Sequence, residues 1–74
     1  MKVYKDINND SGVIAYDYTD ESISVQFESG KVYEYPASII GLEHLSNMKR
    51  LADLGDGLNA YIMKNATVRN GFKR

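Results

Sequence analysis

Three short stretches in the first half of the chain have the spacing of apolar and polar residues that is typical of strands. They cover residues 13–18, 22–28 and 31–35. The clearest is the middle one, in which Ile23, Val25 and Phe27 point to one side and polar residues point to the other. Small and polar residues between the stretches favour tight turns, so the pattern predicts an antiparallel meander.

Tyrosines dominate the other two predicted strands. Ile14, Tyr16 and Tyr18 share one side of the first, and Tyr33 and Tyr35 share one side of the third. We expect Tyr16, Tyr33 and Tyr35 to lie in the core, because a domain of this size must bury one apolar layer to fold. The alternative is an aromatic surface that stacks nucleic-acid bases.

The turn before the third strand ends at Gly30, and the face pattern restricts its length. A two-residue loop would set Val25 opposite Glu34 and place a carboxylate in the core. We therefore expect an odd-length loop or a glycine bulge, with Gly30 at positive φ. The predicted pairs are Phe27 with Tyr33 and Val25 with Tyr35.

Apolar residues recur every three positions from Ile39 to Leu54, after Pro36 ends the third strand. One straight helix would spread this series around its whole circumference, so the spacing predicts a break near Ser46-Asn47. The predicted helices cover 37–45, 47–54 and 57–65. Between the second and the third we expect Gly55 to act as a C-cap.

These elements predict one α+β domain over residues 1–74. Its sheet is a three-stranded antiparallel meander, or a four- or five-stranded one if Val3-Tyr4-Lys5 and the C-terminal segment add strands. Two or three short helices pack on its apolar face. Residues 66–74 are expected to form a flexible, solvated basic tail.

Composition narrows the possible chemistry. The chain has 74 residues and no cysteine, which excludes disulfides, cysteine-bound metal and thiol catalysis. It lacks a long apolar run and a signal-peptide pattern at its start, so we expect a cytoplasmic protein without membrane contact. We expect no cofactor and no metal.

The charge is unevenly distributed, although the net charge is only −1. All ten acidic residues lie at or before Asp56. Six basic residues are the candidates for contacting RNA or another partner: Lys49, Arg50, Lys64, Arg69, Lys73 and Arg74. A net negative chain nevertheless has little bulk attraction to nucleic acid.

No arrangement of residues predicts catalysis. His44, the single histidine, has no apparent partner, and we expect the carboxylates near the first turn (Asp17, Asp20, Glu21) to be solvated. The stretch 54–57 has two glycines but lacks the lysine of a phosphate loop. A small-ligand pocket between sheet and helices remains possible, with Asn59 as a candidate polar contact, but a structural role for Asn59 at the start of a helix is favoured over it.

From about residue 11 to 62 the chain resembles the KTSC domain family, named for the C-terminus of some lysyl-tRNA synthetases. The matching positions are Ser11, Tyr16-Asp17, Ile23-x-Val25-x-Phe27-x-x-Gly30, Tyr33-x-Tyr35 and Gly55-Asp56-Gly57-Leu58-Asn59-Ala60-Tyr61-Ile62. The chain departs from the family in a shorter serine-to-tyrosine spacing, a longer helical stretch, and Asp53 where the family has serine. The resemblance implies a small domain common in bacteria and phages, without an established activity, for which RNA binding is suggested.

Together these observations favour a non-enzymatic interaction module that binds a protein partner or itself. The alternative is an RNA-binding module that uses the six basic residues named above.

Overall fold

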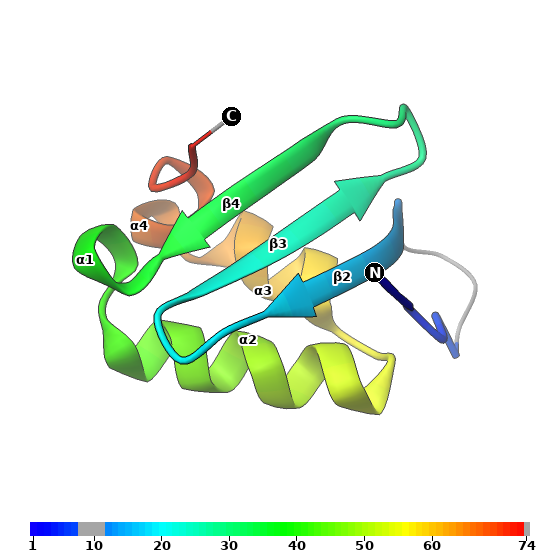
Figure 1. Ribbon diagram of the computed structural model, residues 1–74, viewed down its shortest axis with the longest axis horizontal. Helices are drawn as coiled ribbons and strands as arrows, with labels where there is room; N and C mark the ends of the chain where they lie inside the picture. Colours follow the sequence, from blue (N-terminus) through cyan, green and yellow to red (C-terminus); the bar gives the residue numbers. More distant parts are fainter. Residues whose placement is uncertain (8–11, 74) are drawn as a thin grey trace.

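The computed structural model describes residues 1–7 and 12–73, which form a sheet with helices packed on one face (Figure 1). The strands are β1 (Lys2–Val3), β2 (Val13–Tyr18), β3 (Ser22–Phe27) and β4 (Val32–Pro36). The helices are α1 (Ala37–Ile40), α2 (Leu42–Leu54), α3 (Leu58–Lys64) and α4 (Ala66–Arg69). The strands are antiparallel in the order β1-β2-β3-β4, which confirms the α+β meander predicted from the sequence.

The pairing of β2 with β3 contains a bulge that the sequence did not reveal. Val13 pairs with Phe27 but Ala15 pairs with Gln26, so Ile14 is the extra residue. The bulge places Val13 in the core and leaves Ile14 43% exposed. The prediction that Ile14 shares the buried side with Tyr16 was therefore wrong.

The β3–β4 hairpin has the expected kind of loop. Residues 28–30 form a three-residue connection, and Gly30 has φ 88°. Val25 pairs with Tyr33 and Ile23 with Tyr35, two positions away from the predicted pairs. The predicted pair of Phe27 with Tyr33 would leave residues 28–32 between the strands, whereas the observed connection is residues 28–30. Because the resulting offset is even, the same side chains still face the core.

The break in the apolar helical stretch lies at Gly41 and not near Ser46-Asn47, as the pattern had predicted. Gly41 has φ 90° and separates α1 from an uninterrupted α2. The buried residues of α2 form one stripe, Leu45, Met48 and Ala52. The helix stays continuous because Leu42 and Leu54 are left in solvent, so the full apolar series is not buried.

The N-terminal segment closes the turn between α2 and α3. Gly55 caps α2 with φ 80°, as predicted, and its carbonyl accepts a hydrogen bond from the Ile7 N–H at 2.8 Å. The Leu58 N–H at the start of α3 donates to the hydroxyl of Tyr4 at 3.3 Å. Tyr4 is buried, so a tyrosine from beyond β1 supplies a partner that the helix end would otherwise lack.

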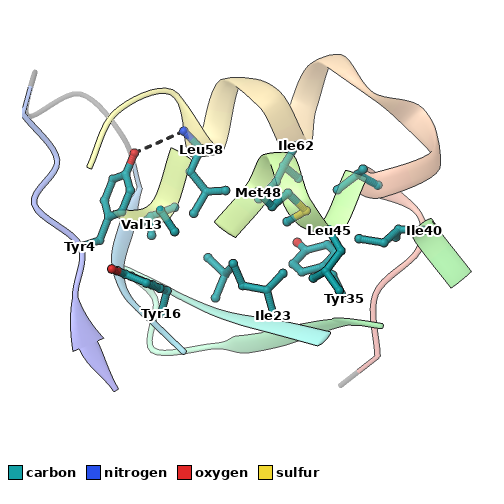
Figure 2. Close-up of a cluster of buried hydrophobic side chains, with 13 residues drawn as sticks. Tyr4, Val13, Tyr16, Ile23, Tyr35, Ile40, Leu45, Met48, Leu58 and Ile62 are labelled. Carbon is teal, nitrogen blue, oxygen red and sulfur yellow. Dashed lines mark hydrogen bonds between the residues drawn. The ribbon is translucent and has the colours of Figure 1, made fainter. Parts of the chain in front are cut away.

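The core lies between the sheet and the helices (Figure 2). Ile23 and Val25 of β3 meet Met48 of α2 and Leu58 and Ile62 of α3. Tyr16 and Tyr35 are buried with them, which confirms the core prediction for these two tyrosines. Tyr33 shares their face of the sheet but is only half-buried.

Residues 66–73 pack against the fold, which differs from the flexible tail expected from the sequence. Val68 of α4 is 0% exposed. Beyond it, Lys73 and Glu34 exchange two backbone hydrogen bonds of 2.6 and 2.8 Å along the outer edge of β4. The expectation failed because Val68 and Phe72 are too few to give a periodic pattern, although both make tertiary contacts. Within the described residues, no helix is long and apolar enough to cross a membrane.

Candidate binding groove

A groove of about 490 Å³ opens between the β3–β4 hairpin and helices α3 and α4. We call it the aromatic groove. Its lining residues are Gly12, Phe27, Ser29, Lys31, Tyr33, Tyr35, Asn59, Ile62, Met63, Arg69 and Phe72. Its volume falls in the range of about 300–1,000 Å³ that is usual for ligand sites.

Three half-open aromatic rings form the wall of the groove on the sheet side. Phe27 pairs with Val13, and Tyr33 pairs with Val25. Because both valines are buried under the helices and paired residues share a face, the Phe27 and Tyr33 side chains also stand on the helix-facing side of the sheet. The Tyr33 ring lies 5.6 Å from Phe27 and 4.6 Å from Phe72, with interplanar angles of 57° and 53°. Phe72 is 37% exposed, so apolar ring surface faces solvent here.

The floor of the groove is closed by Tyr35 and Ile62, which are both buried. Burial, followed by the neighbouring Tyr33, raises the pKa of the Tyr35 hydroxyl to about 12. Tyr35 is therefore neutral at physiological pH and contributes an apolar ring with a hydroxyl, and no charge.

Two cationic side chains lie at the groove, Lys31 from the hairpin and Arg69 from α4. Arg69 donates from Nη1 to the carbonyl oxygen of Met63 at 2.7 Å, which holds its side chain across α3. The guanidinium group has five N–H donors, so this bond leaves others for a ligand. Although the chain has ten acidic residues, none of the described residues that line the groove is a carboxylate. The groove therefore favours a ligand with apolar and anionic parts.

Outside the groove, a polar cluster lies where α2 meets β2. The hydroxyls of Tyr16 and Tyr18 donate to the two carboxylate oxygens of Asp53 at 2.8 and 2.7 Å. Hydrogen bonds from Tyr18 and Tyr16, with the nearby charge of Lys2, hold the Asp53 pKa below its ordinary value. Burial and the bond to Asp53 raise the Tyr16 pKa to about 12, and the bond to Asp53 raises the pKa of Tyr18. These groups fix α2 to the sheet and stay in one protonation state at neutral pH.

His44 has a partner that the sequence did not reveal. Its Nδ1 lies 2.6 Å from the hydroxyl of Tyr61, which also accepts a hydrogen bond from Asn47 at 3.2 Å. All three residues are half-buried where α2 meets α3. The contact joins two helices and lies outside the lining of the aromatic groove.

The structure distributes the six basic residues predicted to contact RNA or a partner over different elements. Arg69 lines the aromatic groove, whereas Lys73 lines a separate hollow beside β4 and α1 together with Glu21 and Glu34. The ammonium of Lys49, on α2, lies 5.2 Å from the centre of the Tyr18 ring, on β2. The exposed Arg50 and Lys64 are on α2 and α3, and Arg74 lies outside the described residues.

Asn59, predicted as a polar contact of a small-ligand pocket, lines the aromatic groove. Sequence reasoning missed Lys31 and Phe72 as groove residues, and it assigned Phe27 to the core. The sequence did offer a signal for Phe27 and Lys31, because they flank the predicted turn that ends at Gly30 and so lie at one end of the sheet. Phe72 gave no local signal because its neighbours are polar. Across residues 1–7 and 12–73, no three histidine, aspartate or glutamate side chains are grouped to hold a metal ion.

No protein family, curated protein or solved structure matches the chain. The function must therefore be argued from the groove itself.

Proposed function

We propose that the chain is a non-enzymatic interaction module that binds a protein partner, or a second copy of itself, through the aromatic groove. The observation that carries the proposal is the exposed aromatic wall beside two cations. Aromatic side chains and arginine are the residues most enriched where proteins bind one another. A half-open wall of Phe27, Tyr33 and Phe72 with Arg69 beside it has this composition.

The protonation chemistry of the groove supports a binding role over a catalytic one. A general acid or base needs a pKa near the working pH and a position at the reacting atoms. The described residues of the groove include no histidine and no carboxylate, and Tyr35 has its pKa raised to about 12. His44 and Asp53 are engaged with tyrosines elsewhere.

The test is selection of a displayed random-peptide library on the immobilised protein and, in parallel, on the variant Phe72→Ala. We expect peptides that are enriched on the natural protein and lost on the variant. Enrichment that is equal on both proteins, or absent from both, would contradict binding at the groove. Light scattering on the protein alone separates the self-association form of the proposal, because a dimer that Phe72→Ala dissociates would identify a second copy as the partner.

The second candidate is an RNA-binding module, as the resemblance to the KTSC family implies. It is favoured by the combination of Arg69 with Phe72 in the groove and of Lys49 on α2 with Tyr18 on β2. RNA binding predicts an affinity that falls steeply with salt. Binding of transfer RNA that does not change between low and moderate salt would eliminate it.

A further inference from the structure

The position of charge around the aromatic groove points to a specific class of partner. We propose that the groove takes a linear peptide segment in which an apolar side chain lies next to acidic residues. This inference rests on the proposed function and adds the chemistry of the ligand.

The apolar side chain would be held by the wall and floor. Phe72 and Met63 keep 37% and 50% of their surface exposed, although Tyr35 and Ile62 beneath them are fully covered. An apolar side chain seated on Phe72 and Met63 removes this surface from water, which is the main driving force for association. The groove volume of about 490 Å³ accommodates a large side chain with adjoining backbone.

The acidic residues would meet Lys31 and Arg69. Lys31 comes from the β3–β4 hairpin and Arg69 comes from α4. A peptide segment that lies in the groove between the hairpin and α4 would therefore pass both cations. Arg69 is held by its bond to the Met63 carbonyl, which reduces the side-chain freedom lost when a carboxylate binds. Asn59 and Ser29 add neutral groups that can bond to a peptide backbone.

Nucleic acid fits the same features less well. The Tyr33 ring is tilted by 57° against Phe27 and by 53° against Phe72, so the three rings offer no parallel platform for successive bases. Nucleic-acid interfaces are also much more positively charged than a groove with two cations on a chain of net charge −1. Two cations match the one or two carboxylates of a short acidic segment.

The experiment measures fluorescence anisotropy with three labelled octapeptides. The first is Gly-Ser-Phe-Leu-Asp-Glu-Gly-Ser; the second has Asn-Gln in place of Asp-Glu, and the third has Lys-Lys. We expect the acidic peptide to bind about tenfold more tightly than the amide peptide, which is the effect of one charge-assisted hydrogen bond, and the lysine peptide to bind least. Equal affinities for the acidic and amide peptides would overturn the inference.

The protein variants locate the effect. Arg69→Gln and Lys31→Gln should each remove most of the preference for the acidic peptide, whereas Arg50→Gln, a matched change on exposed α2, should leave it intact. Loss of preference in Arg50→Gln, or its retention in both groove variants, would overturn the assignment. Circular dichroism of each variant excludes misfolding as the cause.

Failure of the inference is distinguishable from failure of the proposed function. Peptides that are selected from the random library in a Phe72-dependent way but lack acidic residues would overturn the inference and keep the proposed function. Failure of the library to yield Phe72-dependent peptides, together with the absence of a dimer that Phe72→Ala dissociates, would overturn both. Tighter binding of an oligouridine octamer than of the acidic peptide would overturn the inference and indicate that the groove binds RNA.

Discussion

Two parts of the same sheet face differ in how the helices cover them. Where α2 and α3 lie over β3, Ile23 and Val25 are fully buried, and the polar groups beside them are joined to partners (Figure 2). At the hairpin end, Phe27 and Tyr33 stand on the same side of the sheet but are half-open. The sheet side chains of the covered part are inaccessible to solvent, whereas the open part keeps apolar ring surface exposed, with Phe72 37% exposed. The first part therefore stabilises the fold, and the second is the part that we propose binds a partner.

The largest expected effect comes from truncating the covered part. Leu58→Ala removes a fully buried side chain and should lower the free energy of unfolding by about 3–4 kcal/mol. Phe72→Ala, in the open part, should lower it by about 1 kcal/mol, because part of the ring is already exposed in the folded protein. Urea unfolding of the two variants measures the difference. Equal losses would show that the groove belongs to the core.

The next effect concerns the segment that places Phe72 in the groove. A Cβ at Gly71 would lie 2.6 Å from the carbonyl oxygen of Thr67 and 2.7 Å from Ile40 Cγ2. Gly71→Ala should therefore cost about 2 kcal/mol by overpacking and displace Phe72. Gly12→Ala is the control in the same groove, since its nearest atom would be Phe27 Cδ1 at 4.0 Å. Thermal unfolding should separate the two variants, and similar midpoints would contradict the assigned packing.

Removing one buried hydrogen bond should have a smaller effect. Tyr4→Phe keeps the ring in the core but leaves the Leu58 N–H without its hydroxyl partner. We expect a loss of about 1 kcal/mol, together with faster hydrogen exchange at Leu58. Unchanged exchange at this amide would mean that the Tyr4 hydroxyl does not cap α3.

The smallest effect is the pH dependence of the Asp53 cluster. The folded protein lowers the Asp53 pKa, so the ionised carboxylate stabilises the fold above its ordinary pKa of about 4, and this stabilisation is lost as the pH falls through the lowered value. The stability advantage of the natural protein over Asp53→Asn should therefore shrink between pH 5 and the acid limit of about pH 2. At alkaline pH the raised pKa of Tyr16, about 12, predicts stability that is lost as the pH rises above about 10. An advantage over Asp53→Asn that does not change on acidification would contradict the first assignment.

Much of the covered part could be predicted from the sequence. The alternation from Ile23 to Phe27 predicted β3, and the conflict over Glu34 predicted the odd-length loop and the positive φ of Gly30. A stripe of Leu58, Tyr61 and Ile62 was predicted for the helix 57–65; in α3, Leu58 and Ile62 are buried and Tyr61 is half-buried. These signals are local, because each follows from the repeat of a single strand or helix.

The misses share a different physical cause. The bulge at Ile14 and the break at Gly41 are set by how neighbouring elements fit, and either residue is also compatible with regular structure. The groove depends on Phe72 folding back onto Tyr33 at a ring distance of 4.6 Å, a tertiary contact without a sequence repeat. Asn59 was only a candidate pocket contact, and Lys31, which also lines the groove, was not considered, since a lysine near a hairpin tip usually faces solvent.

We propose that the open part of the sheet face binds a partner and that the covered part does not. A titration of the ¹⁵N-labelled protein with the acidic octapeptide, followed by amide chemical shifts, tests this proposal. We expect progressive shifts at groove residues such as Lys31, Tyr33, Asn59 and Phe72, with little change at Ile23 and Met48. Shifts centred instead on the exposed face of α2 around Arg50, or saturable binding without any shift in the groove, would contradict it.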